Sequence, residues 1–236
     1  YIKMLKVEDI SKKFGDFQAI NNLSFELNVG DVMGFLGPNG AGKTTSMRVI
    51  TGFLKADSGR VFIDDKDIDA DPIYTKSQIG YLPEGVPLYL DFSPALYLDY
   101  VCEVRKVQKA QKQIQKVIKD LQLEDVKDVP IETLSKGFKR RVGIAQSLVH
   151  DPKLLILDEP TDGLDPLQKF EVRKLIKKLS KTKAIIISTH ILDEVPEVCN
   201  KCLIIDQGEK KFEGTPGKLK RKVGKSLDEK FRKIIS

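Results

Sequence analysis

A glycine-rich loop near the N-terminus restricts the fold of this chain more than any other part of the sequence. The apolar run Val32–Leu36 leads into Gly37-Pro38-Asn39-Gly40-Ala41-Gly42-Lys43-Thr44-Thr45, and a helix-compatible stretch follows to Ile50. Glycines let successive backbone N–H groups turn toward a phosphate, and the N-terminus of a following helix favours anions. Lys43 would bind the β- and γ-phosphates, and the Thr44 hydroxyl would bind Mg²⁺. The order of strand, loop and helix predicts an α/β protein that binds a nucleoside triphosphate.

Other predicted strands follow two patterns. Leu5 and Val7 alternate with polar residues, as do Leu23, Phe25 and Leu27, which is typical of half-buried strands in an antiparallel sheet. Continuous apolar runs indicate fully buried strands, and they occur at Val32–Leu36, Leu154–Leu157, Ala184–Ile187 and Leu203–Ile205. Because segments of helix length separate these runs, we expect a mainly parallel sheet with helices on both faces.

The segment Pro94–Leu123 has a different pattern. Its apolar residues recur three or four positions apart, at Val107, Ala110, Ile114, Val117 and Leu121. This periodicity predicts an amphipathic helical part inserted into the parallel core. A second helix pattern, around Leu167 to Leu179, follows Pro166, which suits the first turn of a helix.

Two acidic residues follow one of the buried runs. Leu154–Leu157 ends in Asp158 and Glu159, and carboxylates at the carboxyl end of such a strand suit a magnesium–nucleotide site. Asp158 would hold the metal, directly or through water, and Glu159 would polarise the attacking water as a general base. The run Ala184–Ile187 leads to His190, from where its ring could reach the γ-phosphate.

Taken together, these motifs resemble the ATP-binding cassette (ABC) family, and they occur in the family's order across nearly the whole chain. Besides the phosphate loop, the chain has LSKGFKRR (Leu134–Arg141), similar to the signature motif, and ILDEP (Ile156–Pro160), similar to the metal strand with its catalytic glutamate. GLDP (Gly163–Pro166) resembles the D-loop, and STH (Ser188–His190) resembles the segment with the switch histidine. The signature segment is the most specific, because other phosphate-loop families lack it.

The resemblance implies further site residues. Phe14 would stack on adenine, Ser135 and Gly137 would contact the γ-phosphate, and Asp165 would belong to the ATP site. Two positions depart from the family pattern. Lys136 and Phe138 replace a glycine and the glutamine of LSGGQ, and Glu84 replaces a glutamine that binds the metal or water. The carboxylate of Glu84 can still bind Mg²⁺ and adds negative charge near Asp158.

For the fold, the resemblance implies a phosphate-loop NTPase (RecA-like) core with an N-terminal antiparallel β subdomain and an inserted α-helical subdomain. Residues 1–236 would form a single cassette. About 1–84 and 150–215 would be the catalytic core, about 85–149 the helical subdomain with the signature motif, and about 216–236 a basic tail.

For the function, the resemblance implies an ATPase that binds ATP and Mg²⁺ and forms a dimer with a second cassette, homo or hetero. It would drive an integral membrane transport subunit from the cytoplasmic face of the membrane, and the segment Ser226–Phe231 is similar to the ending of the exporter-type (ABC-2) branch. The alternative is a soluble cassette ATPase in translation, DNA repair or complex assembly, which usually has two cassettes or a long coiled-coil insertion. A GTPase should carry an NKxD motif, and Asn200-Lys201-Cys202-Leu203 lacks the aspartate.

The distribution of charge and cysteine excludes some other functions. From Lys210 to Ser236 the chain has ten Lys or Arg and three Asp or Glu, which accounts for the net charge of +6, so nucleic-acid binding by the whole domain is not expected. The three cysteines are sparse, and Cys199-x-x-Cys202 lacks the second ligand pair of a zinc site. Cys202 begins an apolar run, so we expect it in a buried strand. The sequence has no membrane-spanning run and no signal peptide core.

Overall fold

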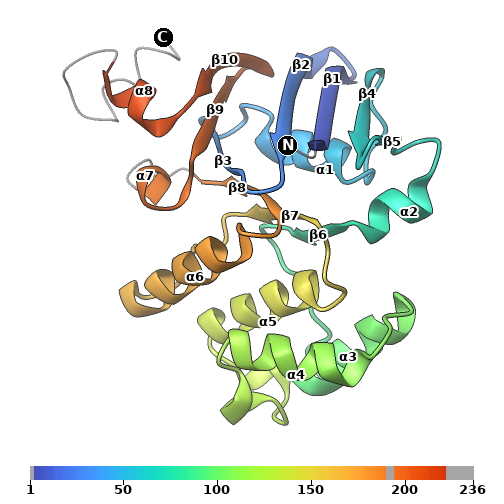
Figure 1. The fold of residues 1–236 in the computed structure, drawn as a ribbon, viewed down its shortest axis with the longest axis vertical. Helices are drawn as coiled ribbons and strands as arrows, with labels where there is room; N and C mark the ends of the chain where they lie inside the picture. The colour runs from blue at the N-terminus through green and yellow to red at the C-terminus, as the bar shows by residue number, and fades with distance from the viewer. Residues whose placement is uncertain (1–2, 190–193, 222–236) are drawn as a thin grey trace.

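The computed structural model describes residues 3–189 and 194–221, in which two sheets lie beside a group of helices (Figure 1). Four strands form an antiparallel sheet in the order β2-β1-β4-β5. They are β1 (Lys3–Phe14), β2 (Phe17–Asn28), β4 (Ser58–Ile63) and β5 (Lys66–Asp67). The alternating patterns near the N-terminus thus predicted β1 and β2 of this sheet, whereas β4 and β5 were not predicted.

A second sheet has six strands in the order β10-β9-β3-β8-β7-β6. They are β3 (Val32–Leu36), β6 (Ile79–Leu82), β7 (Leu154–Asp158), β8 (Ala184–Ser188), β9 (Lys201–Asp206) and β10 (Glu209–Gly214). All neighbours are parallel except β10, which runs antiparallel to β9. Every residue of β3, β7 and β8 is buried, as the continuous apolar runs predict for a sheet covered on both faces. The α/β fold class is confirmed.

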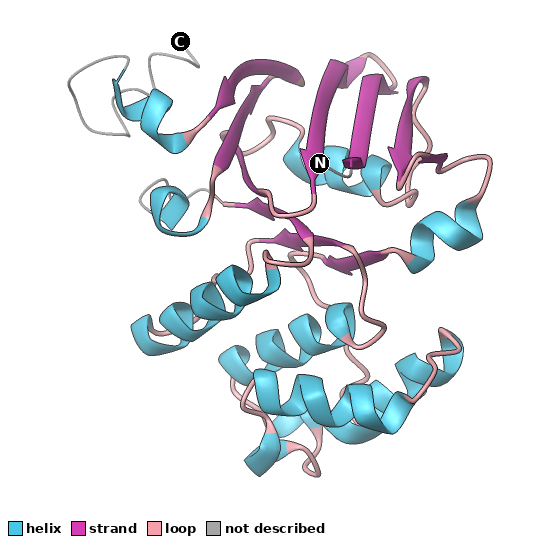
Figure 2. Cartoon of the chain, in the orientation of Figure 1, coloured by secondary structure: helices cyan, strands magenta, loops and turns pink. Residues whose placement is uncertain are grey.

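Eight α-helices and two short 3₁₀ helices are assigned in residues 3–189 and 194–221 (Figure 2). The α-helices are α1 (Lys43–Ile50), α2 (Pro72–Ser77), α3 (Pro94–Val104), α4 (Ala110–Asp120), α5 (Lys136–Leu148), α6 (Pro166–Leu179), α7 (Val195–Val198) and α8 (Pro216–Arg221). The 3₁₀ helices are η1 (Glu124–Val126) and η2 (Ile131–Thr133). No helix in these described ranges is long and apolar enough to cross a membrane.

The predicted helical segment Pro94–Leu123 contains a break that its periodicity does not show. Helix α3 begins where the Ser93 hydroxyl accepts a hydrogen bond from the backbone N–H of Leu96, and α4 starts only after Lys109. Lys106 and Lys109 adopt left-handed backbone conformations, with φ of 53° and 56°. Glycine is the usual residue for this conformation, so the lysines gave no sign of a turn.

The six-stranded sheet separates two hydrophobic cores, because successive side chains of a strand point to opposite faces. Leu155 and Leu157 of β7 pack with helices α3–α6, whereas Leu154 and Ile156 pack with α1 and the antiparallel sheet. Figures 1 and 2 show the same arrangement, with α3–α6 on one side of the sheet and α1 on the other. The second face is thus covered by a helix and a sheet together, rather than by helices alone.

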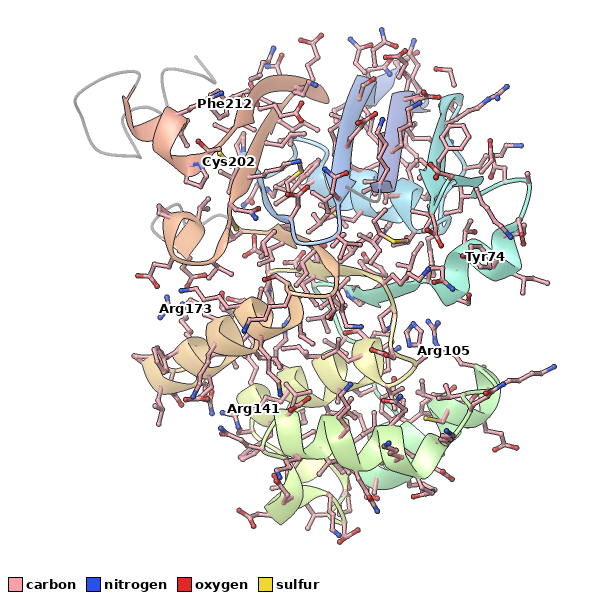
Figure 3. All side chains as sticks on the ribbon, in the orientation of Figure 1. Tyr74, Arg105, Arg141, Arg173, Cys202 and Phe212 are labelled. Carbon is pink, nitrogen blue, oxygen red and sulfur yellow. The ribbon has the colours of Figure 1, made fainter. Side chains whose placement is uncertain are left out.

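The cysteines are buried and take no part in a metal cluster among the described residues. Cys202 lies in β9, as predicted (Figure 3). Burial raises the pKa of the Cys202 thiol to about 11, and burial together with the neighbouring Cys202 raises that of Cys199 to about 12. Such thiols remain protonated and unreactive at neutral pH.

We predict that Gly80→Ala destabilises the fold, because β6 lies directly against α5. A Cβ atom at Gly80 would lie 2.1 Å from the carbonyl oxygen of Ser147 and 2.8 Å from Pro152 Cγ. Overpacking of this kind costs about 1–3 kcal/mol. The melting temperature should therefore fall by roughly 2–12 °C, since 1 kcal/mol corresponds to about 2–4 °C at this chain length. Gly85→Ala is the control, because a Cβ there meets nothing within 4 Å. Equal melting temperatures for both variants would contradict the prediction.

Candidate active site

The carboxyl ends of β3, β6, β7 and β8 meet at one edge of the sheet, where they enclose a cavity of about 730 Å³. This is the edge at which open α/β sheets bind ligands. Eleven of the residues expected at the site line the cavity: Gly37, Pro38, Asn39, Gly40, Gly42, Lys43, Thr44, Thr45, Glu84, Asp158 and Glu159. The cavity is also lined by Phe17, Ala19, Asp162 and Thr189, none of which was assigned to the site from the sequence. The phosphate loop and the two acids thus surround the same space.

The phosphate loop is held by close packing against β2. Gly42, with φ of 101°, precedes α1, and a Cβ atom there would lie 2.3 Å from the carbonyl oxygen of Ala19. Lys43 Nζ donates hydrogen bonds to the carbonyl oxygens of Gly37 (2.7 Å) and Pro38 (3.0 Å). The ammonium therefore lies over the loop and next to the space that the loop surrounds. Ala41 is buried beneath the loop and does not line the cavity.

Burial is the main influence on the charge of Lys43. It lowers the pKa of the Lys43 ammonium, and the carboxylates of Glu159, Asp158 and Glu84 oppose this shift. A phosphate that approaches Lys43 adds negative charge next to it and so stabilises the protonated form. The cavity thus combines the half-buried cation of Lys43 with four carboxylates, those of Glu84, Asp158, Glu159 and Asp162. This arrangement requires further positive charge before it can hold a triphosphate.

Asp158 is oriented by two hydroxyl groups. Its Oδ2 accepts a hydrogen bond from Thr44 Oγ1 at 3.3 Å, and its Oδ1 accepts one from the Ser188 hydroxyl. The carboxylate is 2% exposed and lies at the end of β7. A carboxylate and a hydroxyl at this separation fit a small hard cation such as Mg²⁺, which takes one or two protein carboxylates and completes its octahedron with phosphate and water.

Glu159 has an unusual backbone conformation. Its φ of 51° lies in the left-handed region, which is uncommon for residues other than glycine. Its N–H donates to the carbonyl oxygen and the hydroxyl of Ser188, at 3.2 and 3.1 Å. These bonds hold the strained turn, and the side chain lines the cavity beside Asp158.

Of the two aromatic residues in the β1–β2 hairpin, the one assigned to adenine from the sequence lies outside the cavity lining, and its stacking on adenine stays a prediction. Phe14 does not line the cavity, whereas Phe17 does. The two residues pair across the β1–β2 turn, and Phe17 is 60% exposed. Ala19, two positions further along β2, lies on the same side and contacts the phosphate loop. No signal in the sequence pointed to Phe17, because the register that pairs it with Phe14 around Gly15-Asp16 is set by the folded hairpin.

The signature and D-loop residues lie outside the cavity. Ser135 caps α5, where its hydroxyl accepts a hydrogen bond from the N–H of Phe138 at 3.3 Å. Asp165 caps α6 by accepting a hydrogen bond from the N–H of Gln168 at 2.8 Å. Gly137 packs against the Gln168 side chain, since a Cβ atom there would lie 2.4 Å from Oε1. His190 lies outside the described residues, so its position relative to the cavity stays a prediction.

The two departures in the signature motif have different surroundings. Lys136 Nζ forms an ion pair with Asp162 at 3.0 Å, and its side chain lies over Gly163. Phe138 packs against the core of the helical part, with the guanidinium of Arg141 5.5 Å from its ring centre. Lys136 thus adds a cation at the surface, whereas Phe138 points into the protein.

The comparisons with known proteins agree with the fold and the cavity. Residues 20–162 match the profile of the ABC transporter family. This range includes the phosphate loop, the signature segment and both acids of the cavity. The chain belongs to the ABC transporter family.

Several relatives match nearly the whole chain. It is 34% identical over 221 residues to the ABC transporter ATP-binding protein YxlF of Bacillus subtilis, and this alignment covers 92% of this chain and 73% of YxlF. It is 34% identical over 219 residues to the Nod factor export ATP-binding protein I of Cupriavidus metallidurans, with coverage of 92% and 72%. The lipopolysaccharide export system ATP-binding protein LptB of Haemophilus influenzae is 31% identical over 221 residues, with coverage of 91% and 92%.

Solved structures share the complete fold. The ATP-binding subunit of an ABC transporter superposes with a TM-score of 0.90 at 27% identity, covering 98% of this chain and 99% of that chain. The ADP conformation of MJ1267, an ATP-binding cassette of an ABC transporter, superposes with a TM-score of 0.84 at 28% identity, covering 99% and 98%. The protein is therefore the ATP-binding subunit of an ABC transporter, and it is an ATPase.

We predict that Phe17→Ala weakens ATP binding more than Phe14→Ala does. Stacking of a base on an aromatic side chain contributes about 1–3 kcal/mol, so the Kd of ATP should rise roughly tenfold for Phe17→Ala. Phe14→Ala is the matched control, because Phe14 is also exposed but does not line the cavity. Equilibrium binding of a fluorescent ATP analogue measures both constants. A larger loss for Phe14→Ala would assign the adenine contact to Phe14.

Proposed function

We propose that this subunit powers export by a separate membrane protein, and that Glu159 is the general base for ATP hydrolysis. The observation that carries the catalytic part is the convergence of Lys43, Asp158 and Glu159 on one cavity. The three side chains come from segments far apart in the sequence. Their chemistry matches phosphate binding, metal binding and activation of water, respectively.

Mg²⁺ is the metal that the oxygen donors fit, and Thr44, Asp158 and Glu84 are the residues that would hold it. When bound, Mg²⁺ would neutralise charge on the β- and γ-phosphates. Lys43 binds these phosphates with the backbone N–H groups of residues 37–45. Glu159 accepts a proton from the attacking water, and the Ser188 contacts keep its backbone turned toward the cavity. His190 contacts the γ-phosphate in this proposal.

The functional unit in this proposal is a dimer of two cassettes. Ser135 and Gly137 lie at the N-terminus of α5, a helix of 13 residues that begins outside the cavity. A helix N-terminus favours an anion, and the signature serine adds a hydroxyl donor. The γ-phosphate of ATP in one subunit therefore binds at the signature segment of the other, with Asp165 at the same interface. ATP binding closes the dimer, and hydrolysis opens it.

The membrane subunit docks in a groove between the sheets and the helical part. This groove has a volume of about 440 Å³ and contains the cations Arg48, Lys76 and Arg105 together with Phe53 and Tyr81. Phe53 is 78% exposed. Figure 3 shows Arg105 at the boundary between the helical part and the sheets. These side chains fit a short cytoplasmic helix that presents a carboxylate and an apolar side chain.

Export is supported by the relatives named for Nod factor export and lipopolysaccharide export. A subunit that docks on such a helix lies on the cytoplasmic face of the membrane, as the sequence predicts. The exporter-like segment Ser226–Phe231 lies outside the described residues.

We predict that Glu159→Gln retains ATP and nearly stops hydrolysis. The substitution removes the base but keeps the size of the side chain, so kcat should fall at least about 100-fold, as is typical for loss of a positioned general base. The bound ATP should then keep the dimer closed, which size-exclusion chromatography with ATP detects.

Glu171→Gln on α6 is the matched control. The carboxylate of Glu171 accepts a hydrogen bond from the Gln122 amide and does not line the cavity. It should hydrolyse ATP at the wild-type rate. Normal turnover by Glu159→Gln would show that another group activates the water.

We predict that Arg105→Glu releases the membrane subunit without loss of ATP binding. The charge reversal places a carboxylate where the partner presents its own, and like charges in a desolvated contact repel each other. Purification of the tagged chain in mild detergent should retain a polytopic membrane protein for the wild type and lose it for the variant. Lys112→Glu on the exposed face of α4 is the control and should retain the partner. Equal retention by both variants would contradict the assignment of the groove.

A further inference from the structure

A buried arginine of α5 connects the signature helix to the active site. Arg140 is 6% exposed and lies five positions after Ser135 on α5, which corresponds to roughly 7 Å along the helix axis. Burial of a guanidinium is costly unless its N–H groups find acceptors. The acceptors of Arg140 therefore indicate which part of the protein this charge holds in place.

All four hydrogen bonds described for Arg140 end on main-chain carbonyl oxygens. Nη1 donates to Pro83 at 3.1 Å and to Glu84 at 2.8 Å, in the loop that follows β6. Nη2 donates to Glu159 at 2.5 Å and to Asp158, at the end of β7. The guanidinium is planar and presents its donors in a fixed arrangement. One side chain thus sets the relative position of the two loops that carry Glu84 and Glu159.

The bond to Glu159 acts on a strained residue. With φ at 51°, Glu159 stays in this conformation only because its surroundings hold it there. Ser188 accepts from its N–H group, and Arg140 donates to its C=O group. The peptide units on both sides of the Glu159 Cα are therefore tied, one to β8 and the other to α5.

The charge of Arg140 also suits this location. Burial lowers the pKa of its guanidinium, and four carboxylates oppose that shift, namely those of Asp158, Asp162, Glu159 and Glu84. Arg140 thus lies close to the four carboxylates that line the cavity, and its positive charge offsets part of the repulsion among them. This matters more here than with a glutamine at position 84, because the Glu84 carboxylate adds to the negative charge.

We propose that Arg140 is a positioning residue of the ATPase site, which fixes the backbone of Glu159 and of the Glu84 loop to the signature helix. The inference rests on the proposed role of Glu159 as the base. It adds a direct connection in the same subunit: a shift of α5 moves the carbonyl contacts of Arg140 and so moves the catalytic carboxylate. Binding of ATP without Mg²⁺ by the phosphate loop does not depend on this connection, because the described bonds of Lys43 and of Arg140 involve different partners.

The test compares Arg140→Lys and Arg140→Gln with the wild type. Lysine keeps the charge but cannot reach both loops with a planar pair of donors, and glutamine removes the charge as well. Both variants should lose kcat by about 30- to 100-fold, since a displacement of about 1 Å in a catalytic group costs on the order of 100-fold. The Kd of ATP, measured separately with a fluorescent analogue in the absence of Mg²⁺, should stay within about threefold of the wild type.

Lys183→Gln controls for the loss of any buried cation. Lys183 is 7% exposed and donates to Asp151 and to the carbonyl oxygen of Pro152, at the amino ends of the strands and away from the cavity. The Lys183→Gln variant should have a lower melting temperature than the wild type and a kcat within about twofold to threefold of the wild-type value. If Arg140→Gln does not fold, Arg140→Lys decides alone.

The role of Arg140 is disproved if Arg140→Lys keeps the wild-type kcat, or if its kcat falls only as much as that of Lys183→Gln. Glu159→Gln, measured alongside, separates this result from the proposed function. Normal turnover by Glu159→Gln would overturn the role of Glu159 as the base. If Glu159→Gln is inactive but Arg140→Lys hydrolyses ATP normally, only the role of Arg140 is overturned.

Discussion

The parallel direction of β3, β6, β7 and β8 is the constraint on which the active site depends. Because these strands end at the same edge, the phosphate loop, Glu84, Asp158 and the Ser188 contacts of Glu159 meet there without any further folding device. The two cores on either face of the sheet hold the strands rigidly in this order. Precision at the site is therefore a property of the sheet and its packing, and less of the loops themselves.

Electrostatic balance is the second feature that the site requires. Four carboxylates and the half-buried Lys43 line the cavity, and the charge of Arg140 lies close to the same four carboxylates. A triphosphate adds several negative charges to this set, which is why metal charge and helix N-termini belong to the proposed mechanism. In the proposed dimer, the second copy would supply part of this positive potential through its signature segment, since Ser135 begins α5 outside the cavity of its own chain.

Most of the fold followed from the sequence, because continuous and alternating apolar patterns report directly on burial. The buried strands and α6 were predicted at nearly their observed bounds. The break between α3 and α4 was missed, since lysines rather than glycines adopt the left-handed turns. The cavity residues from the phosphate loop and β7 were recognisable from their motifs. Phe17 and Arg140 were not, because the hairpin register and the carbonyl contacts of a helix side chain depend on tertiary structure.

The contact between Gly137 and Gln168 has a mechanical consequence. There is no space for a Cβ atom between them, Gln168 is itself part of the cap that Asp165 provides for α6, and Lys136 is paired with Asp162. The starts of α5 and α6 are therefore in direct contact through side chains of both helices. In the proposed dimer, a displacement of the signature serine by the second cassette would therefore be transmitted to the D-loop of the same chain.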